Sequence, residues 1–146
     1  MSLCFDFSED QIMMRDAIQT FCKEEIAPLV EEAEKTESFP LELYPKLAEM
    51  GLLGICFEEK YGGLGLDKVT QCILAEELGK TCAGIAKGIA AHVDLGSLPV
   101  AKFGTEEQKQ KYLVPSIAGE MIGALAITEP NAGTDARSIK TNAVKD

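Results

Sequence analysis

The chain has 146 residues, 46% of them hydrophobic and 26% charged, and a formal net charge of −10. This length fits one domain, and the composition is that of a globular chain rather than a disordered or fibrous one. The acidic balance argues against nucleic acid and anionic membranes as partners, and no apolar run approaches the ~20 residues of a membrane span. Because no leader pattern is visible, we expect the cytoplasm, or the mitochondrial matrix if a transit peptide has been removed.

The cysteines predict neither a disulfide framework nor a metal site. They are five in number, far apart, and without C-x-x-C spacing. Their apolar neighbours favour reduced, buried thiols that pack as small hydrophobes in a reducing compartment. The single histidine is a poor metal site by itself, so we expect no metal. These cysteines are Cys4, Cys22, Cys56, Cys72 and Cys82.

A first helix is predicted from about Glu9. Ser8 with Gln11 three residues later is a capping box, which satisfies two backbone donors at a helix start. Pro28 lacks a backbone donor, so we expect it to end or kink the helix near Ala27. The apolar side chains that repeat at helical spacing, and so define the buried face, are Met14, Ile18, Phe21, Cys22 and Ile26.

Phe39-Pro40 opens a second predicted helix. Its apolar stripe comprises Leu43, Leu47 and Met50, and Gly51 is placed to end it. The apolar run 52–57 is short and is expected to be a buried connection rather than a strand. The sequence Y-G-G-L-G at 61–65 lacks the preceding strand that a phosphate-binding loop needs, so a turn is favoured.

A third helix is predicted from an Asp67 cap to about Thr81. The next segment, residues 83–95, is rich in Ala and Gly and predicts a thin helix that other helices approach closely at the bundle centre. His92 lies in this segment, and a packed or hydrogen-bonded helix residue is the favoured interpretation. The predicted apolar side of the third helix consists of Val69, Cys72, Ile73, Leu74 and Leu78.

The pattern changes from helix to strand near Glu120. Thr105 with Gln108 is another capping box, and Pro115 is expected to break the helical run that follows. Residues 121–127 are apolar without helical spacing, and residues 139–144 alternate, so each is expected to be a strand. We therefore predict a helical domain over 1–120 and the beginning of a β-domain over 121–146.

The motif at 123–136, G-A-L-A-I-T-E-P-N-A-G-T-D-A, has the properties of a ligand site. The apolar strand breaks at Pro130 into a turn. Thr128 and Thr134 each offer a hydroxyl that donates and accepts, and Gly133 lets backbone N–H groups approach an anion closely. Such groups suit a flat heteroaromatic ring that carries a phosphate tail.

The string A-I-T-E-P-N-A-G-T-D resembles the flavin-binding signature of the acyl-CoA dehydrogenase family. Four further segments agree with that family in order: E-E-I-A-P, Y-G-G-L-G-L-D, A-E-E-L-G and F-G-T-E-E-Q-K-Q-K-Y-L. The resemblance covers essentially the whole chain. It implies a mainly α fold, the N-terminal helical bundle of an acyl-CoA dehydrogenase-like fold followed by the first strands of its middle β-domain.

The resemblance also implies FAD as cofactor and assigns its contacts. The main chain of Leu125 and Ile127 and the hydroxyl of Thr128 are expected at the polar edge of the flavin. Gly133 and Thr134 are expected where the cofactor phosphates meet the thioester substrate, which makes Thr134 substrate-binding as well. Leu125, Asn131 and Thr134 depart from the residues most common in the family. For Glu129 and Asp135, capping or pairing that fixes the turn is favoured over ligand contact.

The reaction implied for the complete enzyme is α,β-dehydrogenation of an acyl-CoA thioester. A carboxylate removes the α-proton, the β-hydrogen leaves as hydride to the flavin, and an electron-transfer flavoprotein takes the electrons. Family members are much longer and carry the catalytic base in a C-terminal bundle that this sequence lacks. We therefore assign no catalytic residue here and expect the isolated chain to be inactive. Homo-oligomerisation is expected of the complete enzyme, and His92 has the alternative role of a wall of the acyl pocket.

A second hypothesis keeps the scaffold without the chemistry. The chain would then be a non-catalytic helical interaction module whose exposed apolar strand at 121–127 is covered by a partner. Retention of flavin favours the enzyme, and monomeric solubility of the purified chain favours the module. A four-helix protein of unrelated function is a third hypothesis, and the flavin-type signature argues against it.

Overall fold

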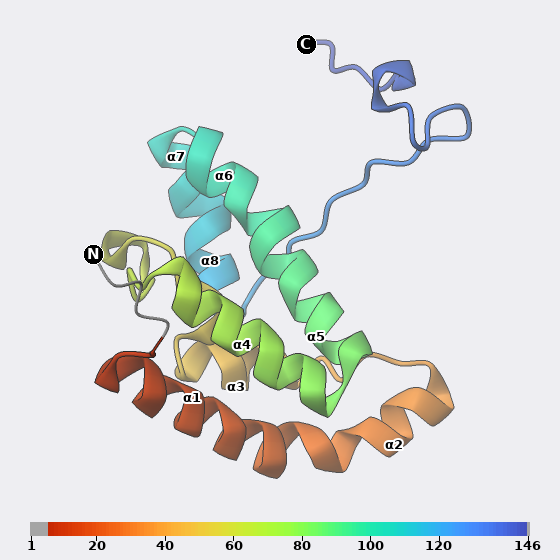
Figure 1. Ribbon diagram of the computed structural model, residues 1–146. Helices are drawn as coiled ribbons and strands as arrows, with labels where there is room; N and C mark the ends of the chain where they lie inside the picture. The colour runs from red at the N-terminus through yellow and green to blue at the C-terminus, as the bar shows by residue number, and fades with distance from the viewer. Residues whose placement is uncertain (1–5, 146) are drawn as a thin grey trace.

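The computed structural model describes residues 6–145. Residues 9–117 form a packed helical body, and residues 118–145 form a tail that leaves it (Figure 1). The elements of the body are α1 (Glu9–Phe21), η1 (Cys22–Ile26), α2 (Ala27–Thr36), α3 (Leu43–Glu49), η2 (Leu52–Gly54), η3 (Glu59–Tyr61), α4 (Lys68–Thr81), α5 (Ala83–Ala90), η4 (Ala91–Ser97), α6 (Leu98–Phe103), α7 (Glu106–Gln108), η5 (Lys109–Leu113) and α8 (Val114–Ile117); the tail carries η6 (Ala136–Ser138).

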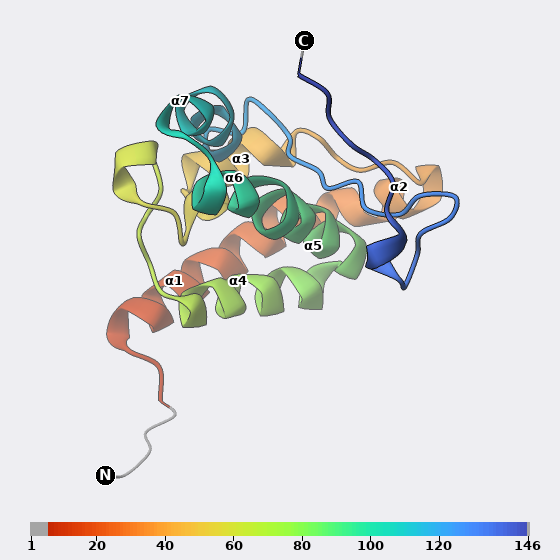
Figure 2. The same ribbon diagram turned by 90° about the horizontal axis from the view of Figure 1, so that it is seen from above.

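The predicted capping box starts α1. The Gln11 N–H donates to Ser8 Oγ at 3.2 Å, and the Ser8 N–H donates to Gln11 Oε1 at 3.0 Å. The predicted buried face is confirmed, with Ile18 and Ile26 completely buried. Helix α1 lies side by side with α4 in both views (Figures 1 and 2).

Three prolines that the sequence places inside helical runs lie directly after π-helical turns. Pro28 follows η1, Pro99 follows η4 and Pro115 follows η5. In each case the residue before the proline bonds to the carbonyl five residues back, as Ala27 does to Cys22. The wider turn moves the preceding carbonyls away from the proline ring, which an ordinary α-turn would place in a clash. Helical structure continues through both prolines, so the expectation that Pro115 breaks its run is wrong. Pro28 does not end its helical run either, and the α-helix changes to a π-turn just before it.

The segment between α3 and α4 contributes buried side chains to the core. Leu43 and Leu47 of α3 are fully buried, and Gly51 ends the helix with φ +72°. Residues 52–57 form the predicted buried connection, which begins with the 3-10 turn η2. Residues 61–65 form the predicted turn, in which a Cβ on Gly63 would lie 2.1 Å from the Phe57 carbonyl oxygen. Backbone therefore packs on backbone at this point.

Helix α4 has the predicted Asp67 cap, whose carboxylate accepts from the Thr70 N–H at 2.8 Å. Its predicted apolar side is only partly confirmed. Val69 is 47% exposed and Cys72 is exposed, because both lie outside the stripe that faces α1 and α5. That stripe consists of Ile73, Leu74 and Leu78.

The cysteines differ in burial. Cys22 and Cys82 are buried as predicted, whereas Cys56 is half-buried and Cys72 is exposed. Burial raises the pKa of the Cys22 thiol. All four are free thiols, and Cys4 lies outside the described residues. The prediction of reduced small hydrophobes therefore holds for part of the set.

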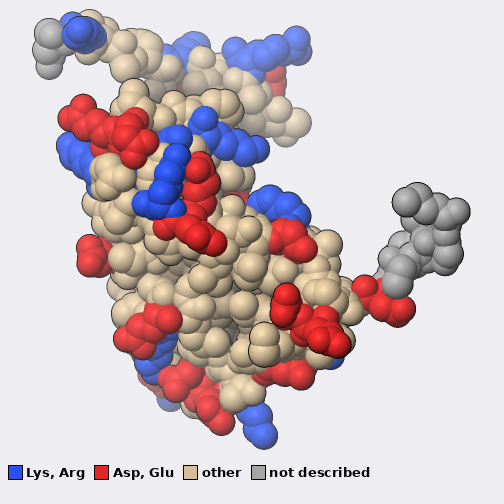
Figure 3. All heavy atoms as spheres, turned by 90° about the vertical axis from the view of Figure 1, so that its left-hand side faces the viewer, with Lys and Arg blue, Asp and Glu red and all other residues tan. Residues whose placement is uncertain are grey.

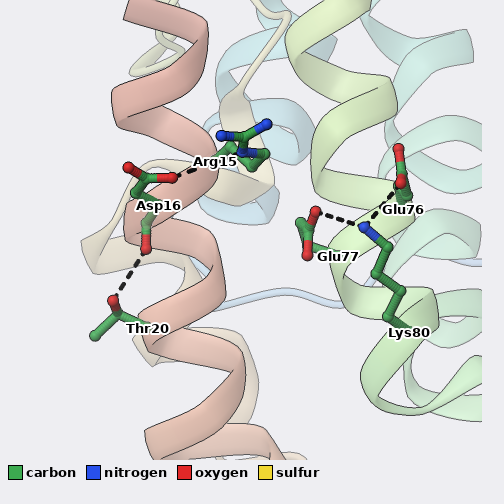
Figure 4. A network of polar contacts seen from close by, with 6 residues as sticks. All are labelled: Arg15, Asp16, Thr20, Glu76, Glu77 and Lys80. Atoms are coloured by element: carbon green, nitrogen blue, oxygen red, sulfur yellow. Dashed lines mark hydrogen bonds and ion pairs between the residues drawn. The ribbon is translucent and has the colours of Figure 1, made fainter.

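Polar side chains of α1 and α4 lie between the two helices, with ion pairs and hydrogen bonds drawn within each helix (Figure 4). Glu77 of α4 points toward α1 with its side chain 7% exposed, and Lys80 bonds its carboxylate at 2.9 Å. This bond, with the smaller opposing effect of burial, lowers the pKa of Glu77. Elsewhere acidic side chains are spread over the surface with Lys and Arg among them (Figure 3). The surface drawn there shows no single basic face for a polyanion.

Helix α5 is approached closely, as its small residues predict. A Cβ on Gly88 would lie 2.4 Å from Cε2 of Phe39, so any side chain there would require the Phe39 ring to shift. Ile85 and Ile89 are buried, but Ala83 and Lys87 are exposed. The expected position at the bundle centre is therefore wrong, because one side of α5 faces solvent.

The tail contains none of the β-strands expected at 121–127 and 139–144. Within residues 6–145 the β-pairing consists of one isolated bridge between Glu129 and Ala132. A strand needs a neighbour to accept its backbone hydrogen bonds, and the helical body offers helices instead. None of the helices in residues 6–145 combines the length and apolar character that crossing a membrane requires.

Candidate functional site

The tail leaves the helical body through a turn directly after α8. Gly119 adopts φ +73°, and the backbone N–H of Glu120 donates to the Pro115 carbonyl at 2.9 Å. Three residues after Glu120, the Gly123 N–H donates to Nδ1 of His92 at 2.9 Å. The tail is therefore fastened to the body at its root.

His92 is held on three sides. It is 1% exposed, and its Nε2 lies 3.2 Å from the Ser116 carbonyl oxygen of α8. The Tyr44 ring of α3 meets the imidazole edge-on, with ring centroids 5.2 Å apart. A neutral imidazole with its proton on Nε2 satisfies both hydrogen bonds, because Nε2 then donates to Ser116 and Nδ1 accepts from Gly123. Burial lowers the pKa of His92, which favours this neutral form.

The residues assigned to the flavin edge lie beyond this fastening, in an exposed part of the tail. Leu125 is 47% and Ile127 is 48% exposed, and Thr128 is also exposed. Within residues 6–145, the main chains of Leu125 and Ile127 and the Thr128 hydroxyl form no hydrogen bond to another residue. These donors and acceptors are available to a ligand, which is what a flavin edge requires.

The turn after Thr128 is held by Glu129. Its N–H donates to the Ala132 carbonyl at 2.9 Å, which closes the bend around Pro130. Its carboxylate accepts from the Lys140 N–H and the Thr141 N–H, both at 2.9 Å, and from the Thr141 hydroxyl. The Thr141 hydroxyl is the main cause of the lowered pKa of Glu129, followed by the two backbone donors. Glu129 therefore has the predicted pairing role.

Asp135 caps the short 3-10 turn η6. Its carboxylate accepts from the Ser138 hydroxyl at 2.9 Å and from the Arg137 N–H at 3.2 Å. These bonds lower the pKa of the Asp135 carboxyl, the Ser138 hydroxyl having the largest effect. The predicted capping role is confirmed, and the carboxylate is already engaged within its own loop.

Gly133 and Thr134 stand at the open side of this loop. No atom lies within 4 Å of where a Cβ on Gly133 would be, and both residues are exposed. The bend thus presents both residues to solvent. The described residues hold no group of three or more His, Cys, Asp or Glu side chains that suits a metal ion.

The structure adds one feature that the sequence analysis missed, the link between His92 and Gly123. Gly96 and Gly123 are the small residues on the two sides of that link. A Cβ on Gly96 would lie 2.4 Å from the Gly123 carbonyl carbon. Nothing in the spacing of two glycines 27 positions apart predicts that they touch.

Comparison with known proteins finds a matching family model and sequence relatives of the same family. The family model for the N-terminal domain of acyl-CoA dehydrogenases matches residues 8–120. A probable acyl-CoA dehydrogenase of Bacillus subtilis is 42% identical over 142 residues, which are 97% of this chain and 37% of that relative. The chain thus spans well under half the length of this relative.

Solved structures agree with this fold. A chain in the structure described as the electron transferring flavoprotein of Acidaminococcus fermentans has a TM-score of 0.92 at 44% identity, over 99% of this chain and 38% of that one. An acyl-CoA dehydrogenase of Bacillus anthracis, solved in complex with FAD, has a TM-score of 0.86 at 42% identity. That match covers 92% of this chain and 23% of the other.

Proposed function

Because this chain belongs to the acyl-CoA dehydrogenase family, we propose that it forms the N-terminal part of a FAD-dependent dehydrogenase of acyl-CoA thioesters. The observation that carries the proposal is the exposed segment 125–128, whose polar groups have no partner among the described residues. We also propose a division into a helical domain over 1–120 and the beginning of a β-domain over 121–146. The end of the family match at residue 120 supports that division.

The flavin contacts proposed here are made by the tail alone. The main chains of Leu125 and Ile127 and the hydroxyl of Thr128 would hold the polar edge of the ring, and Gly133 and Thr134 would hold phosphate. When bound, a flavin supplies the hydride-accepting chemistry of the reaction. The part of this chain is to place fixed donors at a ring edge where negative charge arrives. We assign no catalytic base to it.

The substrate and the electron acceptor belong to the same proposal. Thr134 would contact an acyl-CoA thioester beside the cofactor phosphates. An electron-transfer flavoprotein would take the electrons, and the similarity to a chain in such a flavoprotein structure supports this partner. The complete enzyme would be a homo-oligomer.

The test is a titration of the 15N-labelled chain with FAD, followed by amide NMR shifts, which detect even weak binding. We expect the shifts to concentrate at residues 125–128 and 133–134. Thr128→Val removes the hydroxyl at nearly constant shape and should weaken binding about fivefold, the value of one neutral hydrogen bond. Thr20→Val is the matched control, since Thr20 lies in α1 and bonds only its own helix. Equal affinities of the two variants, or shifts confined to other residues, would refute the assignment.

The non-catalytic module remains the second candidate because the root of the tail is apolar and exposed. Met121 and Ile122 are 41% and 47% exposed, which suits a surface that a partner covers. Analytical ultracentrifugation of the purified chain separates the two candidates when combined with the titration. A stable monomer without FAD-dependent shifts favours the module, and FAD-dependent shifts favour the enzyme.

A further inference from the structure

We propose that His92 positions the flavin-contact segment (residues 125–128) by holding the Gly123 amide on its Nδ1 atom. The proposal rests on the proposed function, which assigns that segment to the flavin edge. In the part of the chain that the structure describes, the Gly123 bond of 2.9 Å is the hydrogen bond that joins residues 122–128 to the helical body. The direction of the segment therefore depends on it.

Contacts with the helical body hold the His92 imidazole independently of its bond to the tail. Its Nε2–H donates to the Ser116 carbonyl of α8, and the Tyr44 ring of α3 packs on its edge. The Ser97 hydroxyl bonds the His92 carbonyl at 2.9 Å. The His92 side chain thus connects α3, η4 and α8 to a single amide of the tail.

Contact between two glycines narrows the position of the tail further. A Cβ on Gly123 would lie 3.2 Å from both Cα and the carbonyl carbon of Gly96, and 3.4 Å from the Ser97 hydroxyl oxygen. The chain therefore passes against the backbone of η4 with no side chain between them. The hydrogen bond to His92 and the backbone contact with Gly96 together restrict the direction in which the chain continues after Gly123.

The leverage of this anchor follows from chain geometry. An extended chain advances about 3.3 Å per residue, so Leu125 and Ile127 lie up to about 7 and 13 Å beyond Gly123. A swing of about 10° at the anchor moves Ile127 by about 2 Å at that reach. Successive main-chain groups of an extended chain alternate in direction, so those of 123, 125 and 127 share a side. Misplacements of about 1 Å are enough to cost a site much of its activity.

The electrostatic surroundings keep His92 neutral. The group that faces it from α3 is the Tyr44 phenol ring, and those from α8 and the tail are the backbones of Ser116 and Gly123. Asp94 from its own turn bonds Gln71 of α4 at 2.7 Å instead. Because no carboxylate among the described residues bonds the ring, nothing offsets the cost of charging it at this depth.

The first test uses the unmodified chain. NMR should detect a nitrogen–nitrogen coupling across the Gly123 N–H···Nδ1 bond, and the imidazole nitrogen shifts should report a proton on Nε2. Absence of the coupling in the folded chain at neutral pH, or a proton on Nδ1, overturns the proposal without any mutation. The measurement needs no flavin.

The second test uses two variants that each keep one half of the imidazole. His92→Asn places an acceptor near the position of Nδ1, whereas His92→Gln places a donor near Nε2. Protection of the Gly123 amide against hydrogen exchange should stay within about threefold in His92→Asn and fall about tenfold in His92→Gln, the value of one lost hydrogen bond. A merely structural histidine predicts the same change in both variants, and that result refutes the proposal.

A third measurement, the FAD titration of both variants, tests whether the anchor affects flavin binding. FAD-induced shifts at 125–128 should weaken in His92→Gln more than in His92→Asn. If the coupling is present and the shifts are absent from all variants, the proposed function fails and the anchor stands. If the shifts are present and equal in both variants, the positioning role fails and the proposed function stands.

Discussion

Adding one methyl group at Gly63 should destabilise the chain far more than its size implies. A Cβ there would lie 2.1 Å from the Phe57 carbonyl oxygen and 2.8 Å from the Gly54 carbonyl oxygen. Those oxygens accept from the N–H groups of Gly65 at 2.9 Å and Leu64 at 3.0 Å. The backbone must open by about 1 Å, which strains both bonds in addition to the overpacking. We expect Gly63→Ala to lower the free energy of unfolding by about 3–5 kcal/mol.

The matched control is the same methyl group at Gly79. That residue lies inside α4 with no atom within 4 Å of its added Cβ. Gly79→Ala should raise the free energy of unfolding by about 0.5–1 kcal/mol, because alanine is the better helix former. Urea unfolding followed by far-UV circular dichroism measures both. A Gly63→Ala chain within about 1 kcal/mol of the parent, at an unchanged denaturant slope, would show that the turn is not packed as described.

Three further predictions concern the histidine, the core and the tail. Because burial lowers the pKa of His92 from 6.5, the unfolded chain binds a proton more readily than the folded chain. The free energy of unfolding should therefore fall as the pH drops below 6.5, by at most about 1.4 kcal/mol per pH unit, and level off below the folded pKa. Urea unfolding measured from pH 7 to pH 5 should show this slope in the parent and no such slope in His92→Asn. Leu47→Ala removes a fully buried side chain and should cost about 2–5 kcal/mol in the same assay, whereas Leu41→Ala, at a residue 60% exposed, should change little. Glu129→Gln weakens the acceptor of the Thr141 N–H, so exchange of that amide should accelerate while the melting temperature stays unchanged; slow exchange in the variant would contradict the pairing.

Much of the helical body could be predicted because its signals are local. A capping box at Ser8 or Thr105 acts within four residues, and Gly51 ends α3 by its own backbone angle. Apolar spacing along α1 identified its buried side because helical periodicity alone determines which residues share a face. These features need no knowledge of the rest of the chain.

The errors came from features that depend on a neighbour. The strands expected in the tail have backbone groups but no second strand to pair with in the helical body. Val69 and Cys72 lie beside the apolar stripe of α4, and only the positions of α1 and α5 decide which side is covered. The link from His92 to Gly123 joins residues 31 positions apart, and no local pattern contains it.

The candidate site shows the same division. Capping by Asp135 was predictable, since its partners lie within three residues. The role of Glu129 was anticipated only as pairing, and its partners at Lys140 and Thr141 became visible in the folded loop. The flavin contacts themselves stay predictions that rest on motif and exposure.

The π-helical turns before Pro28, Pro99 and Pro115 also change how the sequence tolerates length variation. A π-turn spans one residue more than an α-turn, so each is equivalent to a single inserted residue. The wider turn absorbs that residue locally, so the elements downstream keep the phase that an unbroken α-helix would give them. A chain that lost one residue of η4 together with its wide turn would therefore keep the face that holds His92 toward the tail. Each π-turn is thus a point at which the helix accommodates one residue more or fewer without changing which side chains face the core.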